Sequence, residues 1–171
     1  EIIQLFGPDY SAPTALSLTM TGAAEVETTR IPGTCIFRHE LFGDGAPIGG
    51  LTDFTAASTP VFIRIIELAS PVRMTLSFFS LKDVFFFRSN ILSGTVPEGE
   101  FTYLYSGKTR GYPTAKKRFC AIALSGNLCF DNFDIVGSKG TVGFFFSEQS
   151  DKAVSNALAF SEEIAKNLLS E

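Results

Sequence analysis

The chain has 171 residues, of which 45% are hydrophobic, and its formal net charge at pH 7 is −4. This length suits one domain, and the apolar content supports a sizeable core, so a wholly disordered chain is not expected. The acidic balance disfavours general nucleic-acid binding, and no apolar stretch reaches the roughly 18 residues of a membrane span.

Residues 1–33 are predicted to form an irregular N-terminal arm. Pro8, Pro13 and Pro32 interrupt this segment, and only a short strand at Ala15–Met20 is expected. The chain begins at Glu1 rather than Met. That start favours an organellar or exported mature chain with a processed N-terminus, although an artificial boundary would leave the compartment open.

From residue 34 onward the pattern is typical of strands. Cys35, Phe37, His39 and Leu41 alternate with their neighbours at a period of two, and a Gly-Asp-Gly turn follows at 43–45. A Ser-Gly-Asn hairpin signal occupies 125–127, and no helical pattern separates the strands. The sequence therefore predicts an all-β fold over 34–148, an antiparallel β-barrel or sandwich of seven to nine strands. The further strands are expected at 60–69, 72–78, 83–88, 101–105, 117–124, 128–136 and 140–147.

The aromatic composition is unusual, with 18 Phe and no Trp. Two Phe triplets break the strand alternation, and each places aromatic side chains on both faces of its strand. Those strands must be covered on both sides, by the arm, by a helix or by another subunit. We expect some of these side chains to contact a partner, and the candidates are Phe85, Phe86, Phe87, Phe144, Phe145 and Phe146.

The period changes after residue 150. No Pro or Gly interrupts Asp151–Leu169, and apolar residues recur there at helical spacing. The sequence predicts one amphipathic helix over 151–169 that packs on the same domain, with Ser150 as its N-cap. Leu158, Ile164 and Leu168 are expected to be buried against the β-sheet.

Three stretches resemble the allene oxide cyclase and dirigent families, whose members form eight-stranded β-barrels. They are FRHELFGDGAPIGGLTDF at 37–54, LSFFSLKD at 76–83 and CAIALSGNLCFDNFDIVGSKGTVGF at 120–144, about a third of the chain. By this resemblance, the turn and closing-strand positions of those families fall on Gly126, Phe130, Gly137 and Gly140. The chain departs from the families in two ways: Ser125-Gly126-Asn127 replaces their double glycine-threonine-glycine turn, and the C-terminal helix is extra.

The three cysteines do not form a recognisable site. An odd count does not indicate a disulfide framework, and the spacing of Cys35, Cys120 and Cys129 does not fit a zinc site. We expect three small, buried, reduced thiols. A bridge between Cys120 and Cys129 is the alternative.

The only histidine is predicted to have a structural, hydrogen-bonded role. Neighbours in a strand point to opposite faces, so Arg38 and Glu40 lie opposite His39 and the three side chains do not converge. Cys35 shares the face of His39 but lies about 13 Å away along a strand, which excludes a direct Cys–His pair.

One basic cluster stands out, and it consists of Lys108, Arg110, Lys116, Lys117 and Arg118. It could bind an anion or an acidic partner, or it could be a solvated loop entering a strand. No nucleotide-binding, metal-binding or catalytic motif is present in the sequence, so no catalytic residue, cofactor or metal ligand is assigned.

Catalytic residue types are sparse, whereas two-faced aromatic strands and terminal segments are abundant. This balance favours a non-catalytic structural or binding subunit of a larger protein assembly, in contact with other subunits or with itself. The alternative is a barrel that binds a small apolar ligand, such as a cyclase or isomerase that acts by pocket shape. A hydrolase or transferase with unrecognised residues is the third hypothesis.

Overall fold

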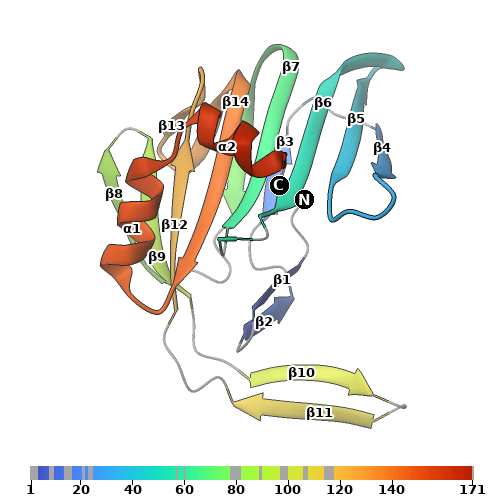
Figure 1. The fold of residues 1–171 in the computed structure, drawn as a ribbon. Helices are drawn as coiled ribbons and strands as arrows, with labels where there is room; N and C mark the ends of the chain where they lie inside the picture. Colours follow the sequence, from blue (N-terminus) through green and yellow to red (C-terminus); the bar gives the residue numbers. More distant parts are fainter. Residues whose placement is uncertain are drawn as a thin grey trace.

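A computed structural model of the chain describes the backbone of most residues (Figure 1). The described backbone covers 4–7, 10–13, 17–20, 22, 25–56, 58–59, 61–77, 82–88, 90–96, 100–105, 108–113 and 118–170. Side chains are described for 20, 22, 25–56, 58–59, 61–76, 90–94, 119–161 and 163–170.

The main body is a ten-stranded antiparallel sheet with the strand order β4-β5-β6-β7-β14-β12-β9-β8, while β3 pairs with β7 and β13 pairs with β14. Two hairpins, β1 with β2 and β10 with β11, form separate small sheets. The all-β antiparallel class is therefore confirmed. The strands are β1 Gln4–Gly7, β2 Tyr10–Pro13, β3 Ser17–Met20, β4 Glu25–Arg30, β5 Phe37–Gly43, β6 Ala46–Thr55, β7 Val61–Ser77, β8 Lys82–Arg88, β9 Ile91–Val96, β10 Glu100–Tyr105, β11 Lys108–Pro113, β12 Arg118–Leu124, β13 Cys129–Asp131 and β14 Asp134–Ser147.

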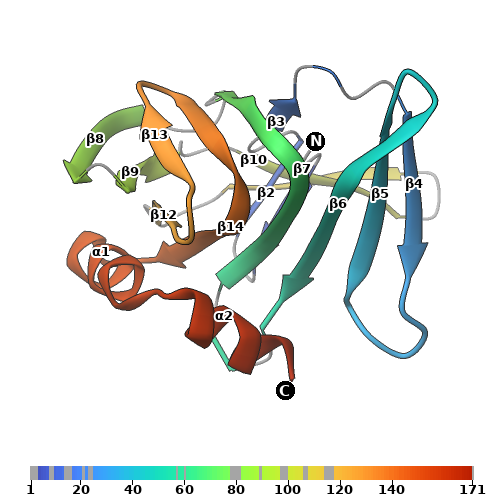
Figure 2. The same ribbon diagram turned by 90° about the horizontal axis from the view of Figure 1, so that it is seen from above.

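The sheet curls but does not close. Its path ends at β4 on one side and β8 on the other, and Figure 2 shows these two strands at opposite ends of a curved sheet. The fold thus fits a barrel or sandwich only loosely. The predicted irregular arm over 1–33 contains four strands, of which β3 covers part of the expected strand at Ala15–Met20 and β4 forms an edge of the main sheet.

The predicted hairpin at 125–127 has a different role. β12 and β13 do not pair with each other. Both pair with β14, and the residues between them interrupt this pairing. Asn127 stabilises this interruption, because its Oδ1 accepts the backbone N–H groups of Ser138 and Lys139 at 3.0 and 2.8 Å. The β14 register shifts at the same place, between Gly137 and Lys139.

Both faces of the sheet are covered along β14, as the Phe triplet predicts. Phe144 lies in the inward core with residues such as Ile66, Met74 and Ile122. Phe145 lies on the outward face, in a second core that the C-terminal helices cover. The C-terminal helices therefore cover the outward face of this strand.

The C-terminal segment forms two short helices, α1 Ser150–Ala159 and α2 Glu162–Leu169, instead of the single helix predicted. The chain is extended at Phe160 and Ser161, and the Ser161 side chain accepts the backbone N–H of Ile164, which starts α2. The predicted cap Ser150 is the first residue of α1, and Gln149 precedes it. The described helices are too short to cross a membrane.

The break changes which helical residues are buried. Leu158 and Ile164 are 44% and 38% exposed, so their predicted burial is wrong, and Leu168 is only partly buried. The buried helical positions are Ala153, Ala157 and Ala165. Because alanine is small, these positions allow the helices to approach the sheet closely, and Phe160 fills the gap by packing edge-on against Phe145 at 5.3 Å.

Candidate binding edge and the polar array beside it

Strand β4 is an open edge of the main sheet. It pairs with β5 on one side, and no described strand pairs with its other side. All six of its residues, Glu25–Arg30, are exposed, including Val26 at 55%. Such an edge presents unpaired backbone N–H and C=O groups, which can pair with another chain.

Hydrogen bonds near the β4–β5 turn show which backbone groups face outward. Ile31 donates its N–H to the carbonyl of Ile36 at 3.0 Å, so this pair is of the hydrogen-bonded type. Hydrogen-bonded and non-hydrogen-bonded pairs alternate in an antiparallel ladder. The pairs at residues 30, 28 and 26 are therefore non-hydrogen-bonded, and the backbone groups of Val26, Thr28 and Arg30 point to the open edge.

The position of the His39 carbonyl supports this alternation. A Cβ built on Gly50 of β6 would lie 3.2 Å from the His39 oxygen, so this carbonyl points towards β6 and away from β4. Thr28 is the β4 residue opposite His39.

A polar array runs from the core to this edge. Arg64 of β7 donates from Nε to Asp53 Oδ1 at 2.7 Å and from Nη2 to Asp53 Oδ2 at 2.5 Å. His39 Nε2 lies 3.3 Å from Asp53 Oδ2, without a well-formed hydrogen bond. On the other side of the ring, His39 Nδ1 hydrogen-bonds the Thr28 hydroxyl at 2.9 Å. The array therefore links the buried Arg64 to the middle of β4.

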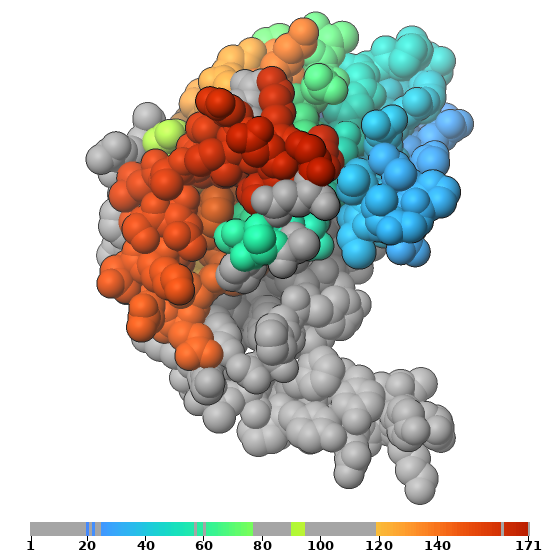
Figure 3. Space-filling view, viewed as in Figure 1, coloured from blue at the N-terminus to red at the C-terminus, as the bar shows by residue number. Residues whose placement is uncertain are grey.

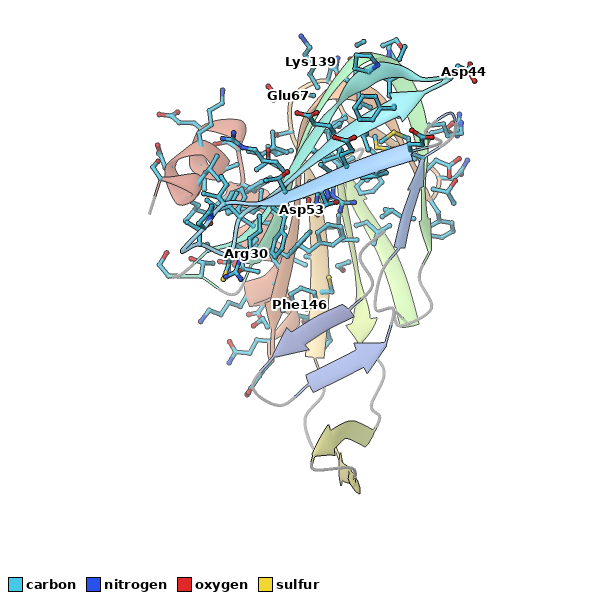
Figure 4. All side chains as sticks on the ribbon, turned by 90° about the vertical axis from the view of Figure 1, so that its right-hand side faces the viewer. Arg30, Asp44, Asp53, Glu67, Lys139 and Phe146 are labelled. Atoms are coloured by element: carbon cyan, nitrogen blue, oxygen red, sulfur yellow. The ribbon has the colours of Figure 1, made fainter. Side chains whose placement is uncertain are left out.

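Asp53 is the anionic centre of the array. Burial raises its pKa, but hydrogen bonds from Arg64 and the contact with His39 outweigh that effect, and its pKa lies below the ordinary value. Arg64 is only 3% exposed and Asp53 only 8%. The pair is thus an ion pair inside the sheet, and its two parallel bonds fix the geometry. Figure 4 shows Asp53 among the strands, whereas Asp44 lies at the tip of the β5–β6 turn.

Exposed charges line the outward face beside the same edge. Glu27 faces Glu40 across the β4–β5 ladder, and this row continues through Gly50 and Glu67 to Lys139. Like charges directly opposite each other are unfavourable. The opposite charge lies nearer the turn, where Arg38 faces Thr29 on the same face.

The aromatic candidates for partner contacts have different environments. Phe144 and Phe145 are buried within the chain, so neither presents a surface to a partner, and Phe146 is partly buried against the inward core. Phe85, Phe86 and Phe87 lie in β8, and their side chains are outside the described residues.

The side chains of the five basic candidates lie outside the described residues. Lys108 and Arg110 lie in β11 and Arg118 begins β12, but their side chains are outside the described residues, as are Lys116 and Lys117 altogether.

Asp131 and Asp134 contact Arg73, each at 2.6 Å. No group of acidic, His and Cys side chains in the described parts could hold a metal ion.

The cysteines only partly follow the prediction. Cys120 is buried and burial raises its pKa, but Cys35 and Cys129 are exposed, contrary to the expected burial. All three are free thiols, so the alternative bridge between Cys120 and Cys129 is not formed.

Sequence reasoning missed Thr28, Asp53 and Arg64 as parts of one array. One signal was available, since a lone arginine inside the apolar run Val61–Ile66 must either face solvent or find a buried acid. The expected hydrogen-bonded role of His39 agrees with its contact to Thr28.

Comparison of the chain with protein-family models, with curated proteins and with solved structures finds no match. The resemblance to the allene oxide cyclase and dirigent families therefore stays a prediction.

Proposed function

We propose that the chain is a non-catalytic binding subunit of a protein assembly, and that a partner adds a strand to the open edge of β4. The observation that carries this proposal is the exposure of every residue of β4, combined with its pairing on one side only. Strand addition uses main-chain hydrogen bonds for affinity and side chains for specificity.

The polar array supports the proposal because it connects the edge strand to the interior of the sheet. The ion pair of Asp53 and Arg64 ties β6 to β7, and His39 connects it to Thr28 on β4. An edge that is already held in strand geometry loses little conformational entropy on binding. The same contacts argue against catalysis by Thr28, His39 and Asp53, because Arg64 holds both carboxylate oxygens of Asp53.

The alternative, a barrel with a small apolar ligand, has less support. The inward face of the curved sheet is occupied by its own side chains, and Ile66, Met74 and Phe144 are fully buried there. A ligand would have to displace this packing. The described inward face is therefore better suited to be a core than a pocket.

Val26→Pro tests the proposal, with Val26→Ala as the matched control. Proline removes the outward N–H at the edge, and residue 26 donates no hydrogen bond to β5. Tagged chains are isolated from the source cells, and their native masses are measured at several hundred micromolar chain so that a weak complex is also retained. We expect a complex for the wild type and Val26→Ala, and free chain for Val26→Pro with unchanged circular dichroism. A wild type that is isolated as a free monomer, or a Val26→Pro variant that keeps the complex, would overturn the proposal.

A further inference from the structure

We infer that the strand that β4 accepts is β4 of a second copy of this chain, in an antiparallel pair with Thr28 on the two-fold axis. The inference rests on the proposed function, since it names the partner of the same edge. Three observations support it: the phase of the outward backbone groups, the order of charges along the edge, and the lack of any described strand paired with the open side of β4.

The backbone groups match themselves in this register. Val26, Thr28 and Arg30 point their N–H and C=O groups outward, as derived from the Ile31–Ile36 bond. With Thr28 opposite Thr28 of the second copy, Val26 faces Arg30 of that copy, and the reverse. Every outward-facing residue of β4 thus meets another, and each such pair exchanges both backbone hydrogen bonds.

The charges along the edge are also self-complementary. The acidic residues Glu25 and Glu27 lie in the first half of β4. Arg30 lies in the second half, where Arg38 of β5 also faces Thr29. In the antiparallel pair, Glu27 lies beside Thr29 of the second copy, and Arg38 of that copy follows in the same row on the same face. The negative charges of Glu27 and Glu40 then lie in one row with the positive charge of Arg38 of the second copy.

The charges also disfavour one of the two neighbouring registers. A shift that places Glu27 on the two-fold axis would set Glu27 directly opposite Glu27 of the second copy, and like charges opposite each other are unfavourable. The register with Thr28 on the axis avoids that contact.

Among the described elements, none pairs with or covers the open side of β4. α1 contacts β9, β12 and β14, and α2 contacts β14, so both helices lie far from β4 in the strand order. Figures 2 and 3 show β4 at the margin of the molecule, beyond the area that the helices cover. Pairing would cover Val26, which is 55% exposed. Val26 of the second copy would lie beside Arg30, in the same row of side chains as Phe37 of β5, which is 39% exposed.

Pairing of two six-residue strands buries less than a standard interface. We therefore expect a weak dimer, with a dissociation constant on the order of micromolar.

Single cysteines test the register. In a chain with Cys35→Ser and Cys129→Ser, Thr28→Cys places two thiols on the axis, with Cα atoms about 5.5 Å apart, within disulfide range. Val26→Cys is the control, because its two copies lie four residues apart, about 13 Å. We expect mild oxidation to give a disulfide dimer with Thr28→Cys and not with Val26→Cys, while Val26→Cys combined with Arg30→Cys again gives the dimer.

Charge exchange tests the complementarity by sedimentation velocity at low salt. We expect Glu27→Arg alone and Arg38→Glu alone to weaken dimerisation at least tenfold, and the double variant to recover most of the wild-type affinity. Equal crosslinking of Thr28→Cys and Val26→Cys, or a wild type that is monomeric at several hundred micromolar, would overturn the inference. A monomer that still loses its native complex in Val26→Pro would leave the proposed function standing with a different partner.

Discussion

Arg64 of β7 holds Asp53 of β6 through both carboxylate oxygens, inside the sheet and almost out of contact with water. This ion pair joins β6 to β7 in the middle of the sheet. Removing one member leaves the other charge buried without compensation, which is more costly than the pair itself is stabilising.

Asp53→Asn should therefore lower the free energy of unfolding by about 3–5 kcal/mol. Urea denaturation measures the change. Asp44→Asn is the matched control: Asp44 is exposed in the β5–β6 turn with φ 50°, a conformation that Asn also tolerates. The control should change stability by less than about 0.5 kcal/mol. Equal effects of the two substitutions would contradict the structural role of the ion pair.

Stability should also fall in acid because of Asp53. Burial raises the pKa of Asp53, but its contacts with Arg64 and His39 lower it further, so the folded-state pKa lies below the unfolded one. At pH values around these two pKa values, the unfolded state binds more protons than the folded state, so the free energy of unfolding rises with pH. The contribution of Asp53 is present above its ordinary pKa of about 3.9 and is lost as the pH falls through its folded-state pKa.

The pH dependence can be assigned by substitution. Urea midpoints between pH 7 and pH 2.5 should vary less for Asp53→Asn than for the wild type. The pKa of Asp134 is also lowered, chiefly by its hydrogen bond from Arg73. That pair is exposed, so its share of the acid sensitivity should disappear in high salt, whereas the share of Asp53 should persist. An unchanged slope in Asp53→Asn would show that other carboxylates cause the acid sensitivity.

The helices give a prediction that reverses the expectation from sequence. Leu158→Ala should change stability by less than about 1 kcal/mol, because Leu158 is 44% exposed and lies outside the buried core. Its neighbour Ala157 is 2% exposed and packs in the outward core. Ala157→Leu should overpack that contact and cost about 1–3 kcal/mol. Thermal and urea denaturation of the two variants would show the order, and a larger loss for Leu158→Ala would contradict the observed docking.

These helices illustrate where sequence reasoning stops. The sequence shows a helical period over Asp151–Leu169, but the helix ends before Phe160, whose ring packs against Phe145 of β14, and Ser161 caps a second helix. The contact joins a strand to the end of the following helix, so helical spacing alone does not contain it. Once the break exists, residues after it change face, and Ile164 becomes exposed while Ala165 is buried.

The strands were more predictable than their arrangement. Alternation around His39 indicates β5 because it is a local property of one strand. Whether the sheet closes depends on β4 and β8, which are far apart in the sequence and do not pair. The polar array was missed for the same reason, since Thr28, Asp53 and Arg64 come from three different strands.

The thiols should divide into two classes. Cys35 and Cys129 are exposed, so a thiol reagent should label both in the folded chain. Cys120 is buried, and burial raises its pKa, so it should react only after unfolding. Mass spectrometry of the labelled protein, with and without denaturant, would measure the difference. Rapid native labelling of Cys120 would show that β12 opens easily.

The last prediction concerns Gly140, a glycine in the middle of β14. Its φ is 156°, and a Cβ there would lie 2.0 Å from the backbone oxygen of Ser125 and 2.9 Å from Leu128. The clash is with backbone, which cannot move without separating β14 from the chain that connects β12 and β13. Gly140→Ala should therefore cost more than about 4 kcal/mol or prevent folding, which is at the upper end for single substitutions. Gly45→Ala is the control, because Gly45 also has a positive φ, 75°, but no atom lies within 4 Å of its Cβ position. It should cost only about 1–2 kcal/mol, the strain of the backbone alone. Soluble yield and urea denaturation would compare the two, and similar losses would show that conformation, not the close approach of the strands, requires glycine at 140.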